Sequence, residues 1–128
     1  MTQWTAEQLQ AIEDNEALYV SPFREDGVTY GTPTETWALV VDGNVYVRAA
    51  NGVDSRWYQA ALAQGAGRVR VDGREYEVVF EASGDENEAE IDNAYQHKYA
   101  TAEDAFAIPI MQGAGPKAAT VRIIPRSA

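Results

Sequence analysis

The stretch Gly67-Arg-Val-Arg-Val-Asp-Gly-Arg-Glu-Tyr-Glu-Val-Val-Phe80 decides the fold class of this sequence. Two runs rich in valine and aromatic residues flank Asp72-Gly73, and this is a strong hairpin signal because a type I′ turn needs positive φ at both central residues. Residues 34–49 repeat the pattern around Asp42-Gly43. The sequence therefore predicts two antiparallel hairpins of similar design.

Charged residues indicate the register of the second hairpin. A two-residue loop sets Arg70 opposite Glu75 and Arg68 opposite Glu77. Opposite charges that face each other across two strands favour this pairing over a slip by one residue, which would also turn the apolar side chains outward.

The first hairpin has two apolar faces. The same rule sets Val40 opposite Val45 and Ala38 opposite Val47, which gives one face of small residues. The other face is too apolar to be left in water, and we expect a helix, a partner subunit or a ligand to cover it. Its residues are Trp37, Leu39, Val41, Tyr46 and Arg48.

Three helices are predicted beside the strands. Thr5 and Gln8 match a capping box that begins a helix over residues 6–15. Asp54 or Ser55 caps a second helix that ends at Gly65. A third helix follows the acidic residues 81–92, and its apolar residues recur at helical spacing.

The remaining elements complete the predicted fold. Short strands are expected over residues 17–22 and 118–124, and loops over residues 23–33 and 108–116; the first loop has the polar, glycine-bearing composition of ligand loops. The pattern favours an α+β fold, a small antiparallel split β-barrel of about six strands with three flanking helices. Residues 1–128 are predicted to form a single domain.

The composition excludes several classes of function. Ten basic against 20 acidic side chains give a formal charge of -10, so a nucleic-acid partner is not expected. The chain has no Cys and one His, which excludes thiolate nucleophiles and Cys-ligated metals, and no metal site is predicted. No apolar run is long enough to span a membrane and no signal segment is evident, so we expect a cytoplasmic protein.

One group of residues is predicted to form a ligand pocket beside the first hairpin. Aromatic rings supply flat apolar walls, and a guanidinium among them can hold a carboxylate or a phosphate. The alternatives are that the aromatic residues belong to the core and that Arg48 pairs with an acid such as Asp54 or Glu35. The candidate residues are Trp37, Tyr46, Arg48, Asn51, Arg56, Trp57 and Tyr58.

The third helix carries the candidates for proton transfer. His97, Lys98 and Tyr99 are consecutive, so at about 100° per residue they cannot all face one site. Lys98 and Tyr99 are favoured over His97 as catalytic candidates. The alternative is that these residues form the surface end of a helix.

The residues resemble the bacterial family known as domain of unknown function 2255, over about residues 4–125. The motifs that carry this resemblance are Gly31-Thr-Pro-Thr-Glu-Thr-Trp37, Val45-Tyr-Val-Arg48, Asn51-Gly52, Trp57-Tyr58, Ala94-Tyr-Gln-His-Lys-Tyr99 and Thr120-Val-Arg-Ile-Ile-Pro125. The chain is more distantly similar to the flavin-binding split barrels and the deazaflavin-dependent nitroreductases. That similarity implies a cofactor phosphate held by basic and hydroxyl side chains on strand ends, with the flavin ring on the barrel side near a dimer interface.

Three readings of function follow from the sequence. The first is a small-molecule-binding split barrel that binds FMN or a deazaflavin and acts as an oxidoreductase on a small conjugated substrate. The second is a cofactor-free ligand-binding module or a homodimer that buries the apolar face of the first hairpin. A cofactor-independent catalyst that uses Lys98 or Tyr99 is a third reading.

Overall fold

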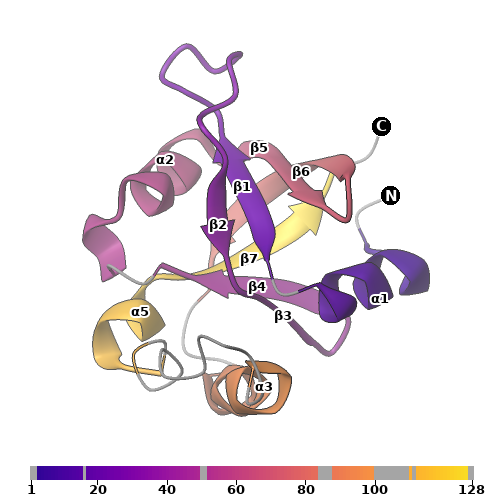
Figure 1. Cartoon of the computed structure of the whole chain (residues 1–128). Helices are drawn as coiled ribbons and strands as arrows, with labels where there is room; N and C mark the ends of the chain where they lie inside the picture. The colour runs from indigo at the N-terminus through magenta and orange to yellow at the C-terminus, as the bar shows by residue number, and fades with distance from the viewer. Residues whose placement is uncertain are drawn as a thin grey trace.

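The computed structural model describes residues 3–15, 17–49, 52–83, 88–99, 110 and 112–126. Within them a seven-stranded antiparallel sheet has the order β2-β1-β5-β6-β7-β4-β3 and curls into a nearly closed barrel (Figure 1). The strands are β1 (Leu18–Pro22), β2 (Thr34–Thr36), β3 (Ala38–Val41), β4 (Asn44–Arg48), β5 (Ala66–Val71), β6 (Arg74–Ala82) and β7 (Thr120–Pro125). The predicted α+β split barrel is confirmed.

Three flanking helices surround the barrel as predicted, namely α1 (Ala6–Asp14), α2 (Arg56–Gln64) and α3 (Glu88–Tyr99). A short 3-10 helix, η1 (Gly52–Asp54), leads into α2. The prediction that the last strand begins at residue 118 is wrong, because the five-residue helix α5 (Ala114–Ala118) precedes β7.

The sheet has one strand more than predicted because the segment before the first turn is divided at Trp37. β2 pairs with β1, where Leu18 faces Thr36, whereas β3 pairs with β4, where Ala38 faces Val47. The two edges of the sheet are thus consecutive in sequence. This bend at Trp37 brings the edges together and gives the sheet its barrel shape.

Both hairpins have the predicted register. Val40 faces Val45 in the first, and Arg68 faces Glu77 in the second. Asp42 and Asp72 both have φ of 52°, and the glycines that follow them also have positive φ, as a type I′ turn requires. Across the second hairpin an ion pair runs diagonally, with 3.2 Å between Arg68 Nη1 and Glu75 Oε2.

The helix ends follow the predicted signals. The Thr5 hydroxyl accepts a hydrogen bond from the Gln8 amide, and the Gln8 side chain accepts one from the Thr5 amide, so the capping box is confirmed. Ser55 is the N-cap of α2, without a side-chain capping bond, and Gly65 ends that helix in the left-handed conformation, with φ of 70°.

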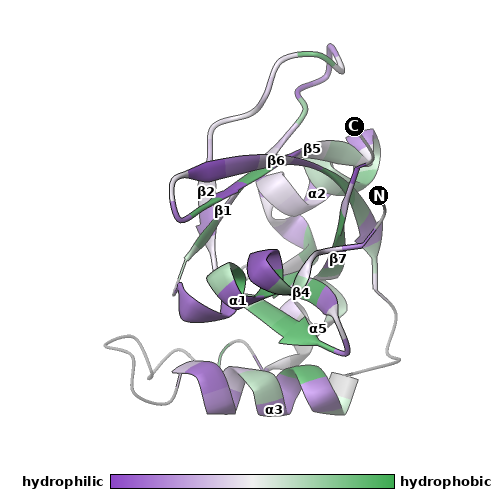
Figure 2. Ribbon diagram, turned by 90° about the vertical axis from the view of Figure 1, so that its right-hand side faces the viewer, coloured by the Kyte–Doolittle hydropathy of each residue, from purple (hydrophilic) through white to green (hydrophobic). Residues whose placement is uncertain are grey.

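The buried residues form two clusters on opposite faces of the sheet. The larger cluster fills the barrel, where the inner side chains of β3 and β4, such as Val45 and Val47, meet those of the other strands. The smaller cluster joins Leu39 and Tyr46 on the outer face to Ile91 of α3. Figure 2 shows α3 lying beneath the part of the barrel that contains β4. A helix therefore covers the apolar outer face, one of the three covers expected from the sequence.

Candidate functional site

Helix α3 encloses part of the predicted ligand site. Tyr46 and Arg48 are 2% and 1% exposed, whereas Trp37 is half-buried. The Trp37 ring stacks on the Tyr99 ring, with 4.0 Å between centroids and 6° between planes. The structure thus brings Trp37, Tyr46 and Arg48 together under α3.

Arg48 is fixed by groups from two other elements. Its Nη1 lies 2.5 Å from Asp92 Oδ1 of α3, and its Nε donates a hydrogen bond of 3.0 Å to Thr120 Oγ1 of β7. The guanidinium carbon lies 5.5 Å from the centroid of the Tyr95 ring. The alternative that Arg48 pairs with an acid is therefore right, but the partner is Asp92 and not Asp54 or Glu35.

Tyr95 lies at the centre of this layer with no exposed surface. Burial raises the pKa of its phenol well above the ordinary value. Among the described residues its hydroxyl has no hydrogen-bond partner of good geometry. The neutral ring packs against the Arg48 guanidinium and Trp37, so it acts as apolar cover for the ion pair.

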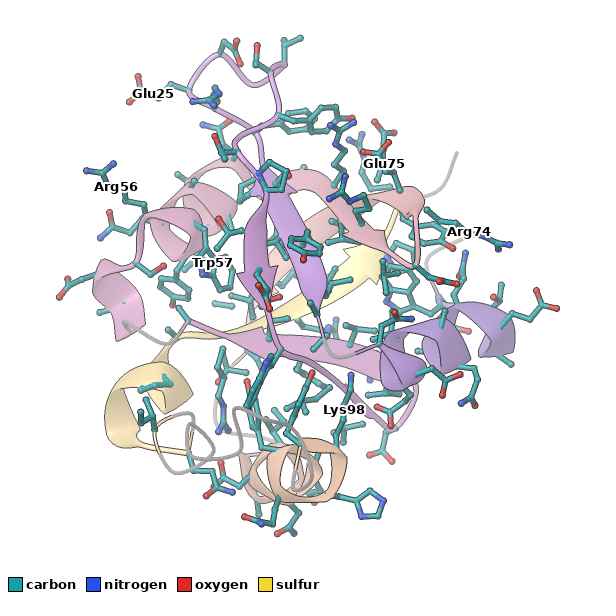
Figure 3. The ribbon with its side chains drawn as sticks, viewed as in Figure 1. Glu25, Arg56, Trp57, Arg74, Glu75 and Lys98 are labelled. Atoms are coloured by element: carbon teal, nitrogen blue, oxygen red, sulfur yellow. The ribbon has the colours of Figure 1, made fainter. Side chains whose placement is uncertain are left out.

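The catalytic candidates Lys98 and Tyr99 link α3 to backbone carbonyls. Lys98 Nζ donates hydrogen bonds of 2.8 Å to the Ile12 carbonyl and 2.7 Å to the Ala38 carbonyl, and Figure 3 shows its side chain directed from α3 toward the barrel. Tyr99 Oη donates to the same Ala38 carbonyl at 3.3 Å. Burial lowers the pKa of Lys98 to about 8, although the carboxylates of Glu13 and Asp14 oppose that shift. Lys98 therefore joins α1, β3 and α3.

The remaining predicted residues lie on or near α2. Tyr58 belongs to the barrel cluster, and the partly buried Trp57 packs against the same cluster. Figure 3 shows the exposed Arg56 side chain directed away from the barrel. Asn51 lies outside the described residues. The four aromatic residues predicted to wall one pocket are therefore divided between two buried clusters.

A groove of about 700 Å³ lies between α2 and the loop after β1. Its apolar floor includes Phe23, whose ring stacks on that of Tyr30 with 5.0 Å between centroids. Its polar lining includes Arg24, Arg56, Gln59 and Gln64. The volume and the combination of an apolar floor with a few polar groups are typical of small-molecule sites.

The loop that forms one wall of this groove is held by Asp26. Its carboxylate accepts hydrogen bonds from the Thr29 hydroxyl and from the backbone amides of Thr29 and Val28, and these bonds lower the pKa of Asp26 to about 2. Arg24 donates a bond of 3.4 Å to Thr32 Oγ1 across the same loop. The Asp26 carboxylate is thus held in its own turn and stays ionised, and the groove lining carries two acids, Glu25 and Asp26, beside its two arginines.

The sequence did not predict this groove. It placed Arg56 in a pocket beside the first hairpin and gave residues 23–33 only the composition of a ligand loop, whereas in the structure Arg56 lines the groove beside α2 together with Phe23, Gln59 and Gln64. The useful signal was the spacing of Arg56, Ala60 and Gln64, which places them on one face of a helix.

The family of the chain is established by comparison with family models. The model described as "Uncharacterized protein conserved in bacteria (DUF2255)" matches residues 8–123. The chain belongs to this family. No curated protein sequence matches it.

Two solved structures share the fold of this family member. A conserved hypothetical protein from Mycobacterium tuberculosis is 17% identical with a TM-score of 0.60, and the match covers 97% of this chain and 80% of that one. An FAD-binding protein from Mesorhizobium loti is 14% identical with a TM-score of 0.56, and the match covers 98% of this chain and 90% of that one. At this level of identity the likeness shows the fold.

The described residues also bear on membranes and metals. No helix among them is long and apolar enough to cross a membrane. They contain no group of three or more His, Cys, Asp or Glu side chains arranged to hold a metal ion.

Proposed function

We propose that this protein binds a flat conjugated cofactor of the flavin type, FMN, FAD or a deazaflavin, and works as an oxidoreductase on a small conjugated substrate. The groove beside α2 is the proposed site. The observation that carries the proposal is that the chain shares its fold, over 98% of its length, with a protein described as FAD-binding. Small-molecule sites occur preferentially on such preformed concave surfaces.

The residues of the groove fit the two chemical parts of such a cofactor. Phe23, Ala60 and Ala63 offer apolar area for a ring system. Arg24 and Arg56 offer guanidinium groups for phosphate oxygens, which arginine binds through paired N–H donors. Glu25 and the ionised Asp26 line the same groove and balance the charge of the two arginines, so a phosphate depends on direct contact with Arg24 and Arg56 and not on a net positive charge.

A flavin-type cofactor, when bound, supplies transfer of a hydride or of single electrons. The chain itself contributes binding and orientation. Gln59 and Gln64 line the groove with side-chain amides, and Gln59 Nε2 also donates a hydrogen bond of 3.2 Å to the Val53 carbonyl. The Phe23–Tyr30 stack and the Asp26 turn hold the loop wall in place before a ligand arrives, which reduces the ordering cost of binding.

The test is the absorbance spectrum of the purified protein, followed by titration with FMN, FAD and a reduced deazaflavin monitored by cofactor fluorescence. We expect saturable binding of at least one cofactor, and Arg56→Gln is expected to weaken it about tenfold, as loss of one charge-assisted contact does. Arg74→Gln is the matched control, because Arg74 is an exposed arginine at the second hairpin turn.

Each outcome bears on a separate part of the proposal. Absence of saturable binding by all three cofactors refutes it. Binding that Arg56→Gln and Arg74→Gln affect equally refutes the assignment to the groove beside α2. Binding without reduction of the cofactor by any substrate leads to the second reading, a ligand-binding module without redox activity.

The homodimer predicted to use the apolar face of the first hairpin needs a different surface. Tyr46 on that face is 2% exposed because α3 covers it. A homodimer therefore stays a prediction, and Tyr46→Glu is expected to disturb the packing of α3 and not to report on an interface.

A further inference from the structure

The loop between β1 and β2 forms one wall of the groove beside α2. Phe23, Arg24, Glu25 and Asp26 of this loop line the groove. Residues 23–33 project beyond the strands at the top of Figure 1, and projecting loops are more mobile than the elements they connect. The position of this wall therefore depends on the contacts that tie the loop to the sheet.

Tyr30 makes two such contacts and is not itself a lining residue of the groove. Its hydroxyl donates a hydrogen bond of 2.7 Å to Glu77 Oε1 of β6, and the guanidinium carbon of Arg68 on β5 lies 4.1 Å from the centroid of its ring. Arg68 is held in turn by its ion pair with Glu75. The bond to Glu77 raises the pKa of the Tyr30 phenol, so the hydroxyl keeps its proton and stays a donor. Tyr30 thus has partners on two strands of the sheet.

The Tyr30 ring passes this restraint on to Phe23. The two rings stack with 5.0 Å between centroids and 21° between planes, and the backbones of the two residues form an antiparallel bridge at the base of the loop. Phe23 is half-buried and lines the groove. The next residue, Arg24, donates a hydrogen bond of 2.8 Å from its amide to the Thr29 carbonyl across the loop. A chain of contacts therefore runs from the sheet through Tyr30 to the apolar floor of the groove.

We propose that Tyr30 is a positioning residue of the cofactor groove, and that its bond to Glu77 holds Phe23 and the loop wall in the arrangement that a flavin-type ring needs. The inference rests on the proposed function, because it assumes that the groove beside α2 takes the cofactor. Tyr30 does not touch the ligand. It acts by ordering the loop in advance, and loss of its contacts lets the loop open and displace Phe23.

The first experiment measures how firmly the loop is held, and it needs no cofactor. Tyr30→Phe keeps the ring and removes only the hydroxyl that binds Glu77. Hydrogen exchange of the Arg24 amide, followed by NMR, reports opening of the loop because this amide is bonded to the Thr29 carbonyl. Exchange in Tyr30→Phe is expected to be about fivefold faster than in the wild type, as the loss of one exposed hydrogen bond predicts. Exchange at the wild-type rate overturns the proposal.

The second experiment connects the loop to the cofactor, with FMN, FAD and a reduced deazaflavin as probes. Tyr30→Ala also removes the stack on Phe23 and the contact with Arg68, so the loop should be open for most of the time. The apparent dissociation constant rises as the closed fraction falls, and about fivefold weaker binding is expected. Saturating cofactor should also slow exchange of the Arg24 amide in Tyr30→Phe, since a ligand that needs the closed loop favours it. A merely architectural role of Tyr30 would change neither the affinity nor this protection.

Tyr19→Ala is the matched control, because Tyr19 is a half-buried tyrosine of β1 whose ring lies 5.2 Å from the guanidinium carbon of Arg70. It should leave exchange at Arg24 and cofactor affinity unchanged. If the wild type binds none of the three cofactors, the proposed function fails and the role of Tyr30 at the site fails with it. If the wild type binds, this proposal alone is overturned when Tyr30→Ala binds equally well, when Tyr19→Ala binds as weakly as Tyr30→Ala, or when bound cofactor leaves exchange at Arg24 unaffected.

Discussion

Removal of the Asp92 carboxylate is expected to destabilise the fold strongly, because it breaks the ion pair beneath α3. The Arg48 side chain has no exposed surface, whereas the Asp92 side chain is 25% exposed. Breaking a buried ion pair costs about 3 to 5 kcal/mol because one charge is left buried with less compensation. Water reaches Asp92 in part, so the lower figure of about 3 kcal/mol is expected for Asp92→Ala, or about 10 °C in melting temperature for a domain of this size.

The measurement is the free energy of unfolding from urea titration, together with thermal melting. Glu81→Ala is the matched control, because it removes an ion pair that lies at the surface. Arg122 Nη2 lies 3.3 Å from Glu81 Oε1, and the two side chains are 37% and 52% exposed respectively. Loss of such a surface pair is expected to cost at most about 1 kcal/mol. The double change Arg48→Met with Asp92→Leu is expected to recover most of the lost stability, since both charges are then absent. If Asp92→Ala and Glu81→Ala had the same free energy of unfolding, the buried Arg48–Asp92 pair would contribute no more to stability than a surface pair, and the reasoning would be refuted.

Three further predictions concern stability. Burial lowers the pKa of Lys98 from 10.5 to about 8 in the folded protein, so between these pH values the unfolded chain binds more protons than the folded one. The free energy of unfolding of the wild type should therefore rise relative to that of Lys98→Met between about pH 8 and pH 10. A constant difference between the two proteins over this range would contradict the prediction. Gly67→Ala should lower the free energy of unfolding by about 2 kcal/mol, because a Cβ there would press on the Ser21 carbonyl and lie 2.7 Å from Pro22 Cα. Gly115→Ala is the control and should lower it little, because a Cβ at Gly115 meets no atom within 4 Å. Thr5→Ala should lower the free energy of unfolding by about 1 kcal/mol through loss of the capping box, as urea titration would show.

The hairpins could be predicted from the sequence because their signals are local. An Asp-Gly turn fixes the loop length, the loop length fixes the register, and the register fixes which side chains share a face. The outer face of the first hairpin was identified correctly in this way. The break at Trp37 was missed because a bend between two strands depends on which neighbours each half pairs with, and that pairing is not local.

The candidate site was harder to predict because residues that could bind a ligand at the surface become part of the core once another element covers them. Arg48, Tyr46 and Trp37 form the expected aromatic and cationic group, but α3 covers the face that bears them. The sequence showed both an apolar face in need of cover and a helix with an apolar stripe. Nothing in the spacing of either element indicated that one would pack on the other, since that contact joins segments 44 residues apart at Arg48 and Asp92.

The excess of acidic residues makes the placement of the arginines informative. Arg48 forms an ion pair with Asp92. The guanidinium carbons of Arg68 and Arg70 lie 4.1 Å and 5.2 Å from the centroids of the Tyr30 and Tyr19 rings. These three guanidinium groups therefore make contacts within the fold. Arg56, by contrast, stands at a concave surface that also offers an apolar wall. In a chain of net charge -10 an anionic group is repelled over most of the surface, and binding is favoured only where a free guanidinium and apolar area coincide. That coincidence, rather than aromatic content, is what separates the groove beside α2 from the aromatic layer under α3.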